Sequence, residues 1–362
     1  MKRTTVLLIA VLMLLCSCAK PSANKKKEIR SSSTPIATPY AQTEMPTHVS
    51  GDRLISHFID VGQGDCEFIE LPNGKCMLID AGEWNCAEAV ISYINKLKYK
   101  KLDYVVVTHA HSDHMGGMSE VIRSFDVGRI FMPKAGNNTL SYEKLLQAVS
   151  DKGLKIKAAK AGVTVCSEEG LLVELIAPVR DYDDLNNTSA VVKITFGDNV
   201  FLYMGDAESE SESDITADVR CDVCKVGHHG SNSSSTADFV SRTHAKYAVI
   251  SVGADNSYGH PKEKVIKRWE SFGAQILRTD ILGTIVITGD GKAVSVSNTK
   301  QTGMAESVSD DSMLILNTNT MKIHRSDCEH VKEINPDNIE ETTQSVEELI
   351  RAGYSRCKMC NP

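Results

Sequence analysis

The sequence predicts an α/β fold in which two β-sheets pack face to face with helices outside, followed by a small C-terminal unit. Short apolar strands mix with helices in two similar halves of the chain, which is typical of layers packed around one core. A polar segment at 299–312 then separates residues 313–362 from the rest. Since one domain has about 100–200 residues, a chain of 362 residues allows more than one domain.

The N-terminus has the features of an export signal. Two basic residues precede an apolar stretch at 6–15 that is too short to span a membrane. The next stretch, LCSC, resembles a bacterial lipobox in which Cys18 receives lipid after cleavage; plain secretion is the alternative. We therefore expect residues 1–18 to be a lipoprotein signal and residues 19–52, rich in Ser, Thr, Pro and Lys, to be a flexible linker. The protein would be lipid-anchored on the extracytoplasmic face of the cell membrane.

The main domain, residues 53–298, contains short apolar runs separated by turn residues, together with two segments of clear helical spacing. In its first half the predicted strands lie at 54–62, 65–71, 76–82 and 103–109, and the predicted helices at 86–98 and 141–153. In its second half the predicted strands lie at 171–178, 189–197, 199–206, 221–227, 246–253 and 283–291, and the predicted helices near 233–242 and 261–272. Its cysteines are scattered without regular spacing, which is typical of buried thiols and does not indicate a disulfide framework.

The stretch THAHSDH follows a buried strand and contains four side chains that can bind metals. His109, His111, Asp113 and His114 lie within six positions, where the chain must turn and can point several side chains at one place. Neutral imidazoles and a carboxylate are ligands that suit zinc, manganese or iron. This spacing predicts a metal site directly after the strand.

These residues match the HxHxDH signature of the metallo-β-lactamase-fold hydrolases. The motif LIDAG ends a strand at Asp80, FLYMGD ends another at Asp206, and KVGHHGS follows the next strand, as in that family. The stretches FIDVGQGDCEFIEL, NNTSAVVKITFG, VGHHGSNSSS and SVGADNSYGHP further resemble the hydrolase domain of ComEC, the DNA-uptake channel. The resemblance covers roughly residues 53–298 and implies a four-layer αββα sandwich. We expect a free-standing, lipid-anchored relative of that domain.

The resemblance also implies a site for two divalent metal ions, zinc or manganese. The first ion would have only three protein ligands, because DDLNNTSA holds no histidine where many members of the family supply one: His109, His111 and Asp206. Asp206 would bridge to the second ion, whose further ligands would be Asp113, His114 and one of His228 and His229. His229 is preferred by resemblance to related phosphodiesterases that have a paired histidine. An open position on the first ion is typical of a catalytic site.

Further polar residues of the same motifs are candidates for catalysis or substrate binding. We assign catalytic roles to Asp113, His228 and His260; His260 would contact the phosphate or protonate a leaving group, or be a structural loop histidine. Asn187 and Ser189 would donate hydrogen bonds to substrate, order the ligands of the first ion, or only begin a strand. Asp65 and Asp80 are expected to orient ligands.

The chemistry implied is hydrolysis of a phosphodiester, because two metal ions lower the pKa of a shared water and neutralise charge on a phosphate. The expected function is a nuclease acting on DNA. The alternatives are a phosphodiesterase for a cell-wall polymer or small molecule, and a non-catalytic DNA receptor. A net charge of −7 excludes a broadly basic surface, so DNA binding would require a local basic patch.

Residues 313–362 contain a second set of metal-ligand types. The pattern H-x3-C followed by C-x2-C has the spacing of one tetrahedral, structural zinc, with His324, Cys328, Cys357 and Cys360 as ligands. A disulfide or free thiols are the alternatives. The unit resembles the metal-binding module of the Ada methyl-repair protein, but His324 stands where that module has its methyl-accepting cysteine, so methyl transfer is not expected. Its basic residues are candidates for contacts with DNA phosphates.

Overall fold

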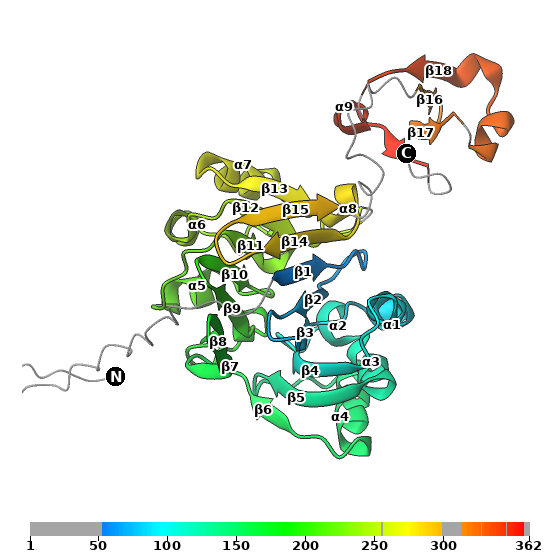
Figure 1. The fold of residues 1–362 in the computed structure, drawn as a ribbon. Coiled ribbons are helices and arrows are strands. Elements are labelled where there is room, and N and C mark those ends of the chain that lie inside the picture. The colour runs from blue at the N-terminus through cyan, green and yellow to red at the C-terminus, as the bar shows by residue number, and fades with distance from the viewer. Residues whose placement is uncertain (1–52, 255, 299–312, 327, 345, 358–362) are drawn as a thin grey trace, which may run out of the picture. The chain divides into compact units, whose positions relative to one another are not determined.

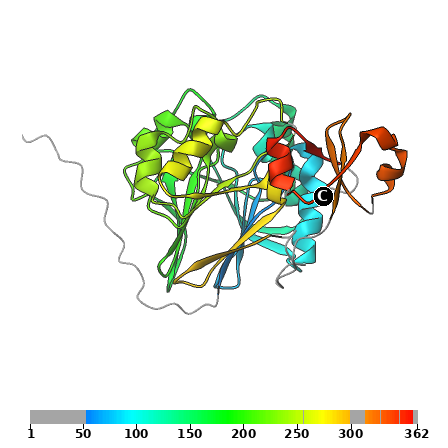
Figure 2. The same cartoon turned by 90° about the horizontal axis from the view of Figure 1, so that it is seen from above.

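The main domain consists of two mixed β-sheets packed face to face, with helices on both outer faces (Figures 1 and 2). The computed structural model describes the chain except for residues 1–52, 255, 299–312, 327, 345 and 358–362. This arrangement is the four-layer αββα sandwich, so the predicted fold class is confirmed.

The first sheet has eight strands in the order β15-β14-β1-β2-β3-β4-β5-β6. Its pairs from β3 to β6 are parallel, and the others are antiparallel. The strands are β1 (Leu54–Phe58), β2 (Glu67–Glu70), β3 (Cys76–Ile79), β4 (Lys101–Val106), β5 (Asp126–Met132), β6 (Ile156–Ala158), β14 (Ile285–Gly289) and β15 (Val294–Asn298).

The second sheet has seven strands in the order β13-β12-β11-β10-β9-β8-β7. Its pairs from β10 to β13 are parallel, and those from β7 to β10 are antiparallel. The strands are β7 (Val163–Glu168), β8 (Leu171–Ala177), β9 (Val191–Phe196), β10 (Asn199–Tyr203), β11 (Val223–Lys225), β12 (Tyr247–Ile250) and β13 (Gln275–Arg278).

The helices cover the outer faces of the two sheets. On the first sheet, apolar side chains of α1, α3 and α4 pack against the strands; the second sheet is covered by α6 and α7 in the same way. The helices of the main domain are α1 (Ala87–Lys96), α2 (Ser112–Met115), α3 (Met118–Ser124), α4 (Leu140–Asp151), α5 (Ser209–Asp214), α6 (Ala237–Thr243), α7 (Glu263–Ser271) and α8 (Thr279–Leu282).

The core between the two sheets is formed by apolar side chains of both. Phe58 of β1 stacks against Tyr203 of β10 with ring centroids 5.9 Å apart, within the range of about 4.5–7 Å that is typical of aromatic pairs. The hydroxyl of Tyr203 donates to the Ser56 hydroxyl at 2.9 Å, so the one polar atom of this buried ring has a partner in the facing sheet. These contacts fix the two sheets against each other.

Most of the predicted elements are present, with boundaries that differ by a few residues. The sequence analysis missed five strands and four helices of the main domain: β5, β6, β7, β13, β15, α2, α3, α5 and α8. The missed β5 carries Asp126, Gly128 and Arg129 among its apolar residues and does not show a plain strand pattern. Helix α6 begins at a cap from Thr236, whose hydroxyl accepts from the Phe239 amide at 3.2 Å, so the predicted helix start near the serine run is correct to within a few residues.

The C-terminal unit has its own four-stranded sheet, in the order β18-β16-β17-β19. Its small core consists of Leu316, Ile323 and Leu349. The elements are β16 (Leu314–Asn317), β17 (Lys322–Arg325), β18 (Ile339–Thr342), α9 (Val346–Arg351) and β19 (Ser355–Arg356). The predicted signal at 1–18 with Cys18, both linkers and Cys360 lie outside the described residues.

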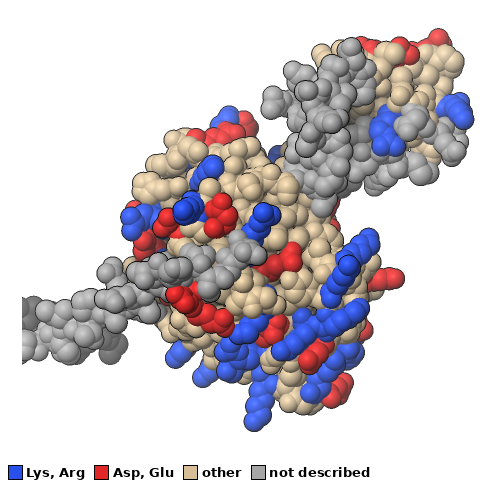
Figure 3. All heavy atoms as spheres, in the orientation of Figure 1, with Lys and Arg blue, Asp and Glu red and all other residues tan. Residues whose placement is uncertain are grey.

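The surface of the main domain carries a basic patch. Lys and Arg side chains gather over β4, β5 and β6 on the face that Figure 3 shows. The three strands themselves contain Lys101, Arg129 and Lys157. This patch is local, because the whole chain has a net charge of −7. Among the described residues, none of the helices combines the length and the apolar character that crossing a membrane requires.

Candidate metal centre

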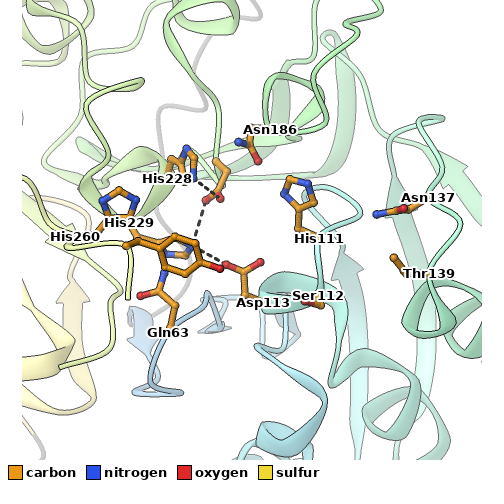
Figure 4. A pocket seen from close by; sticks show the side chains of 12 residues that line it. Gln63, His111, Ser112, Asp113, Asn137, Thr139, Asn186, His228, His229 and His260 are labelled. Carbon is orange, nitrogen blue, oxygen red and sulfur yellow. Dashed lines mark hydrogen bonds and ion pairs between the residues drawn. The ribbon is translucent and has the colours of Figure 1, made fainter. Parts of the chain in front are cut away.

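The candidate ligands follow the carboxyl ends of parallel strands in both sheets. Asp80 follows β3 and His109 follows β4, while Asp206 follows β10 and His229 follows β11. β3 pairs with β4 in parallel, and β10 pairs with β11 in parallel. In each sheet these side chains therefore lie together at the end where the parallel strands have their carboxyl termini. The two edges meet at one open pocket of about 320 Å³, where His111 and side chains from the turn after β11 converge (Figure 4).

The first cluster joins His109, His111 and Asp206. The Nε2 atom of His109 lies 3.0 Å from Nδ1 of His111 and 3.9 Å from Oδ2 of Asp206. All potential ligand atoms of this cluster lie within 4.8 Å of one another. Burial and the neighbouring charge on His114 hold the pKa of His109 well below its ordinary value, so this imidazole is neutral. A neutral imidazole is the form that binds a metal ion.

The second cluster joins Asp113, His114, Asp206 and His229. The Nε2 atom of His229 lies 3.2 Å from Oδ2 of Asp113 and 3.6 Å from Oδ1 of Asp206. The Nε2 atom of His114 lies 3.1 Å from the same Asp206 oxygen. Asp206 therefore faces both clusters, with Oδ2 toward His109 and Oδ1 toward His114 and His229. Two adjoining His/Asp clusters of this kind are typical of a binuclear metal site.

Unpartnered polar atoms at the centre fit a bound cation. Nε2 of His114 and Oδ1 of Asp206 are buried, and neither makes a hydrogen bond within the described part of the chain, although they lie 3.1 Å apart. Burial alone would lower the pKa of His114, but the carboxylates of Asp206, Asp65 and Asp113 raise it well above its ordinary value. The carboxylates therefore attract positive charge to this point, and a metal ion would supply it in place of the proton.

Asp80 orients the buried ligand His114. Its carboxylate accepts from the backbone amide of Thr108 at 2.8 Å, from the Thr108 hydroxyl at 2.6 Å and from Nδ1 of His114 at 2.7 Å. Because Nδ1 of His114 donates to Asp80, Nε2 of the ring points into the second cluster. Asp80 thus lies behind the cluster, as the sequence analysis expected of an orienting residue.

Asp65 has a similar position behind His229. Its Oδ1 lies 3.2 Å from Nδ1 of His229, which also donates to the carbonyl oxygen of Ser251 at 2.9 Å. The other carboxylate oxygen of Asp65 accepts from Nζ of Lys225, and both side chains are buried. Lys225, which the sequence analysis did not select, therefore supplies the counter-charge of the carboxylate behind this ligand.

Two glycines let the loops of the centre approach one another. A Cβ atom on Gly64 would collide with the backbone carbonyl oxygen of Asp113, and the φ of +140° also disfavours other residues there. A Cβ atom on Gly205, whose φ is +52°, would lie 2.8 Å from Cβ of Thr108. Both glycines therefore keep Asp113 and Asp206 close to their partners.

Asn187 and Ser189 lie behind the first cluster and do not line the pocket. The Ser189 hydroxyl accepts from the Asp206 amide at 3.0 Å and lies 3.3 Å from Nδ1 of His109. The side-chain oxygen of Asn187 accepts from the amides of Glu208 and Ser211, both at 3.1 Å. Of the roles expected for these two residues, their geometry favours ordering of the site; direct binding of substrate stays a prediction.

The paired histidines occupy a strained turn between Gly227 and Gly230. His228 and His229 have φ values of 48° and 50°, in the left-handed region that residues other than glycine seldom adopt. This backbone lets two consecutive side chains face the same pocket. His229 lies in the second cluster, whereas Nε2 of His228 lies 3.8 Å from Oδ2 of Asp206, on the side of the first cluster.

Glu208 orients His228 and was missed by the sequence analysis. Its Oε1 accepts from Nδ1 of His228 at 2.8 Å, from the Ser233 hydroxyl at 2.7 Å and from the side-chain Nδ2 of Asn186 at 3.1 Å. Because a carboxylate can only accept, Nδ1 of His228 is the donor to Glu208, and this contact turns Nε2 of the ring toward Asp206. The signal in the sequence was an acid two positions after Asp206.

His260 lines the pocket beside His228, with ring centroids 5.7 Å apart. Burial, together with the neighbouring histidines His228 and His229, lowers the pKa of His260 to about 4. The ring is therefore neutral at pH 7, and its buried Nδ1 has no hydrogen-bond partner among the described residues. Contact with a phosphate or proton donation to a leaving group stays a prediction for this residue.

Replacing Glu208 should disturb the orientation of His228 without changing metal binding at the second cluster. We expect Glu208→Gln to lower kcat for the phosphodiester hydrolysis that the sequence predicts. The decrease should be about 10–100-fold, because this range is typical for partners that orient the histidines of a metal site. The content of metal held by Asp113, His114 and His229 should not change, since Glu208 contacts none of them. Steady-state kinetics and elemental analysis measure the two effects. Glu210→Gln, at an exposed acid that pairs with Arg180, is the matched control; equal activity of the two variants would contradict the assigned role.

The C-terminal unit brings three of its four predicted zinc ligands together. Ligand atoms of His324, Cys328 and Cys357 lie within 4.8 Å of one another, and all three residues are buried. Nδ1 of His324 has no hydrogen-bond partner within the described residues, and burial lowers the pKa of this ring, so a neutral imidazole faces two thiols. This donor set suits zinc. The fourth predicted ligand, Cys360, lies outside the described residues.

Cys357→Ser should remove one zinc per chain and leave the main domain active. The expected reason is that one thiolate of a tetrahedral site is lost, while the clusters of the main domain contain no cysteine. Elemental analysis of the purified full chain gives the zinc content. Cys86→Ser is the control, because Cys86 belongs to none of the described clusters and its thiol donates to the Val61 carbonyl oxygen and to Oδ1 of Asn85. The same zinc content in both variants would show that Cys357 does not bind the ion.

Comparison with known proteins places the main domain among metal-dependent hydrolase folds. The Metallo-beta-lactamase superfamily matches residues 59–254. ComE operon protein 3 of Bacillus subtilis is 32% identical over 248 residues, covering 63% of this chain and 32% of that protein. Competence protein ComA of Neisseria gonorrhoeae is 29% identical over 238 residues, covering 62% and 31%. Recombination protein 2 of Haemophilus influenzae is 27% identical over 233 residues, covering 63% and 28%.

The chain spans about a third of the length of these relatives. The match to the superfamily covers more than half of the chain and includes the motif THAHSDH and the turn with the paired histidines. The chain therefore belongs to the metallo-beta-lactamase superfamily and is related to bacterial competence proteins.

Proposed function

We propose that the main domain is a metal-dependent phosphodiesterase that acts on DNA. The observation that carries the proposal is the position of Asp206, which faces both His/Asp clusters at the lining of one open pocket. A carboxylate shared by two clusters, with space beside it for a substrate, is the arrangement of enzymes that hydrolyse phosphate esters with two metal ions.

Different residues of the chain would hold the metal ions, orient the histidines and contact the substrate. Divalent ions held by the two clusters, zinc or manganese, would activate a water and neutralise charge on the phosphate. Asp80 fixes the ring of His114, and Glu208 fixes the ring of His228 with Nε2 toward the pocket. The open pocket has amide side chains such as Gln63 in its lining, which can donate hydrogen bonds to the sugar or the phosphate of a bound strand. None of these roles requires a serine or cysteine nucleophile.

Two observations support DNA as the substrate. Two relatives are named a competence protein and a recombination protein, and the motifs of this chain resemble the hydrolase domain of a DNA-uptake channel. The basic patch over β4, β5 and β6 offers contacts for a phosphate backbone, although the chain as a whole is acidic. The proposal places the enzyme outside the cell membrane, held by lipid on Cys18. The C-terminal unit would hold a structural zinc and contact DNA phosphates through residues such as Lys322.

Hydrolysis of labelled DNA tests the proposal. The full chain without its signal is incubated with single-stranded DNA, double-stranded DNA and a small chromogenic phosphodiester, each with zinc or manganese. We expect metal-dependent cleavage of DNA that a chelator abolishes. Cleavage of the small diester alone would favour a non-nucleic substrate such as a cell-wall phosphodiester. DNA binding without cleavage of any substrate would favour a non-catalytic receptor.

A further inference from the structure

An exposed aromatic side chain lines the pocket of the metal centre. Tyr258 has 63% of its surface accessible to solvent, yet it belongs to the lining that also includes Asp206 and His228. Its ring stacks on that of His260, with centroids 5.8 Å apart and planes inclined by 11°. Since His260 covers one face of the ring, the accessible area lies mostly on the other face and at the edges.

The loop that carries Tyr258 is held by hydrogen bonds on both sides of it. The side-chain amide of Asn256 donates to the carbonyl oxygens of Gly253 and His260 at 2.8 and 2.7 Å, and its oxygen accepts from the His260 amide at 3.0 Å. Nζ of Lys262 donates to the Tyr258 carbonyl oxygen at 2.7 Å. A ring held in this way loses little freedom when a ligand stacks on it, which favours binding.

We propose that Tyr258 is a stacking platform for an unpaired nucleobase, belonging to the nucleotide next to a phosphodiester that the metal centre would hold. This proposal rests on the proposed function and names the form of the substrate. A single aromatic face accepts any base, because every base has a π-face. A quaternary ammonium ligand is a poorer fit, since such cations are typically enclosed by several aromatic rings. Apart from histidines, Tyr258 is the only aromatic residue in the pocket lining among the described residues.

The platform implies a preference for single-stranded or frayed DNA. In a duplex, neighbouring bases already cover both faces of an internal base, so stacking on Tyr258 requires that the base leave its stack. Leaving the duplex costs free energy, and this cost is absent in a single strand. We therefore expect single-stranded DNA to be bound more tightly and cleaved faster than blunt double-stranded DNA of the same sequence.

Two variants and two oligonucleotides test the platform. Tyr258→Phe keeps the ring, whereas Tyr258→Leu keeps an apolar side chain without one. The substrates are a single-stranded oligonucleotide and a strand of the same length in which every base is replaced by an abasic residue. Tyr258→Leu should weaken binding of the normal oligonucleotide and lower its kcat/KM by about tenfold, within the range typical of one lost base-stacking contact. Tyr258→Phe should behave like wild type.

The abasic oligonucleotide provides the decisive comparison. It should bind to wild type and to Tyr258→Leu equally weakly, because the stacking partner is already missing from the DNA. If Tyr258→Leu lost the same factor of affinity for both oligonucleotides, the proposal would be overturned and Tyr258 would have a structural role. Binding is measured by fluorescence anisotropy alongside cleavage. If wild type binds both oligonucleotides but cleaves neither, the proposed function fails. The platform is then still tested by binding alone, through the affinities of wild type and Tyr258→Leu for the two oligonucleotides.

Discussion

Asp206→Asn should release metal from both clusters and abolish hydrolysis. The change keeps the size of the side chain but removes the charge that faces His109 on one side and His114 and His229 on the other. We expect kcat to fall by at least about a thousandfold, which corresponds to about 4 kcal/mol of lost transition-state stabilisation. The metal content per chain, measured by elemental analysis after dialysis, should fall for both ions together because the carboxylate is shared.

The control for this prediction is Asp198→Asn. Asp198 is an exposed aspartate immediately before β10, whereas Asp206 follows the same strand at its other end. The control should keep both its metal and its activity. Full metal content in Asp206→Asn would contradict the shared ligand, and loss of only one ion would assign Asp206 to a single cluster.

The position of the metal centre could be predicted from the sequence because its ligands follow strands that are easy to recognise. The apolar runs before His109 and Asp206 predict buried strands, and polar residues directly after them indicate the carboxyl ends where parallel strands deliver side chains. The short spacing of THAHSDH gathers several ligands locally. Only the resemblance to the metallo-β-lactamase-fold hydrolases connected these residues with Asp206 and the paired histidines, which are distant in sequence.

Some of the supporting residues could not be predicted, because their roles depend on contacts between distant segments. Glu208 reaches His228 only through the left-handed turn after β11, which local preferences disfavour for histidines. Asn187 was expected to contact substrate, to order the ligands of the first ion or only to begin a strand, and its contact with the backbone after Asp206 favours the ordering role. Tyr258 carries no motif, and only its exposure beside the pocket indicates a role. Lys225 did leave a signal, since a lysine inside an apolar strand must find a buried partner.

Lys225→Met should destabilise the main domain strongly. Lys225 and its partner Asp65 are both buried, and the other carboxylate oxygen of Asp65 faces Nδ1 of His229. Burial alone would lower the pKa of Lys225, but Asp65, Glu67 and Asp206 raise it, so the amine is charged. Methionine fills similar volume but leaves the Asp65 carboxylate without its counter-charge. Removing one partner of a buried ion pair typically costs about 3–5 kcal/mol, and we expect the free energy of unfolding to fall by that amount.

Urea unfolding of the chelated full chain measures this loss through intrinsic fluorescence, because both tryptophans, Trp84 and Trp269, lie in the main domain. Lys267→Met is the matched control: this lysine also pairs with a carboxylate, Glu263, but both side chains are exposed, so its removal should change stability far less. Adding Asp65→Asn to Lys225→Met removes both charges and should recover much of the lost stability. The recovered variant should still bind metal at the second cluster more weakly than wild type, because the amide that replaces Asp65 orients His229 less firmly. If Lys225→Met alone were as stable as Lys267→Met, the buried pair of Lys225 and Asp65 would not contribute to the free energy of unfolding as predicted.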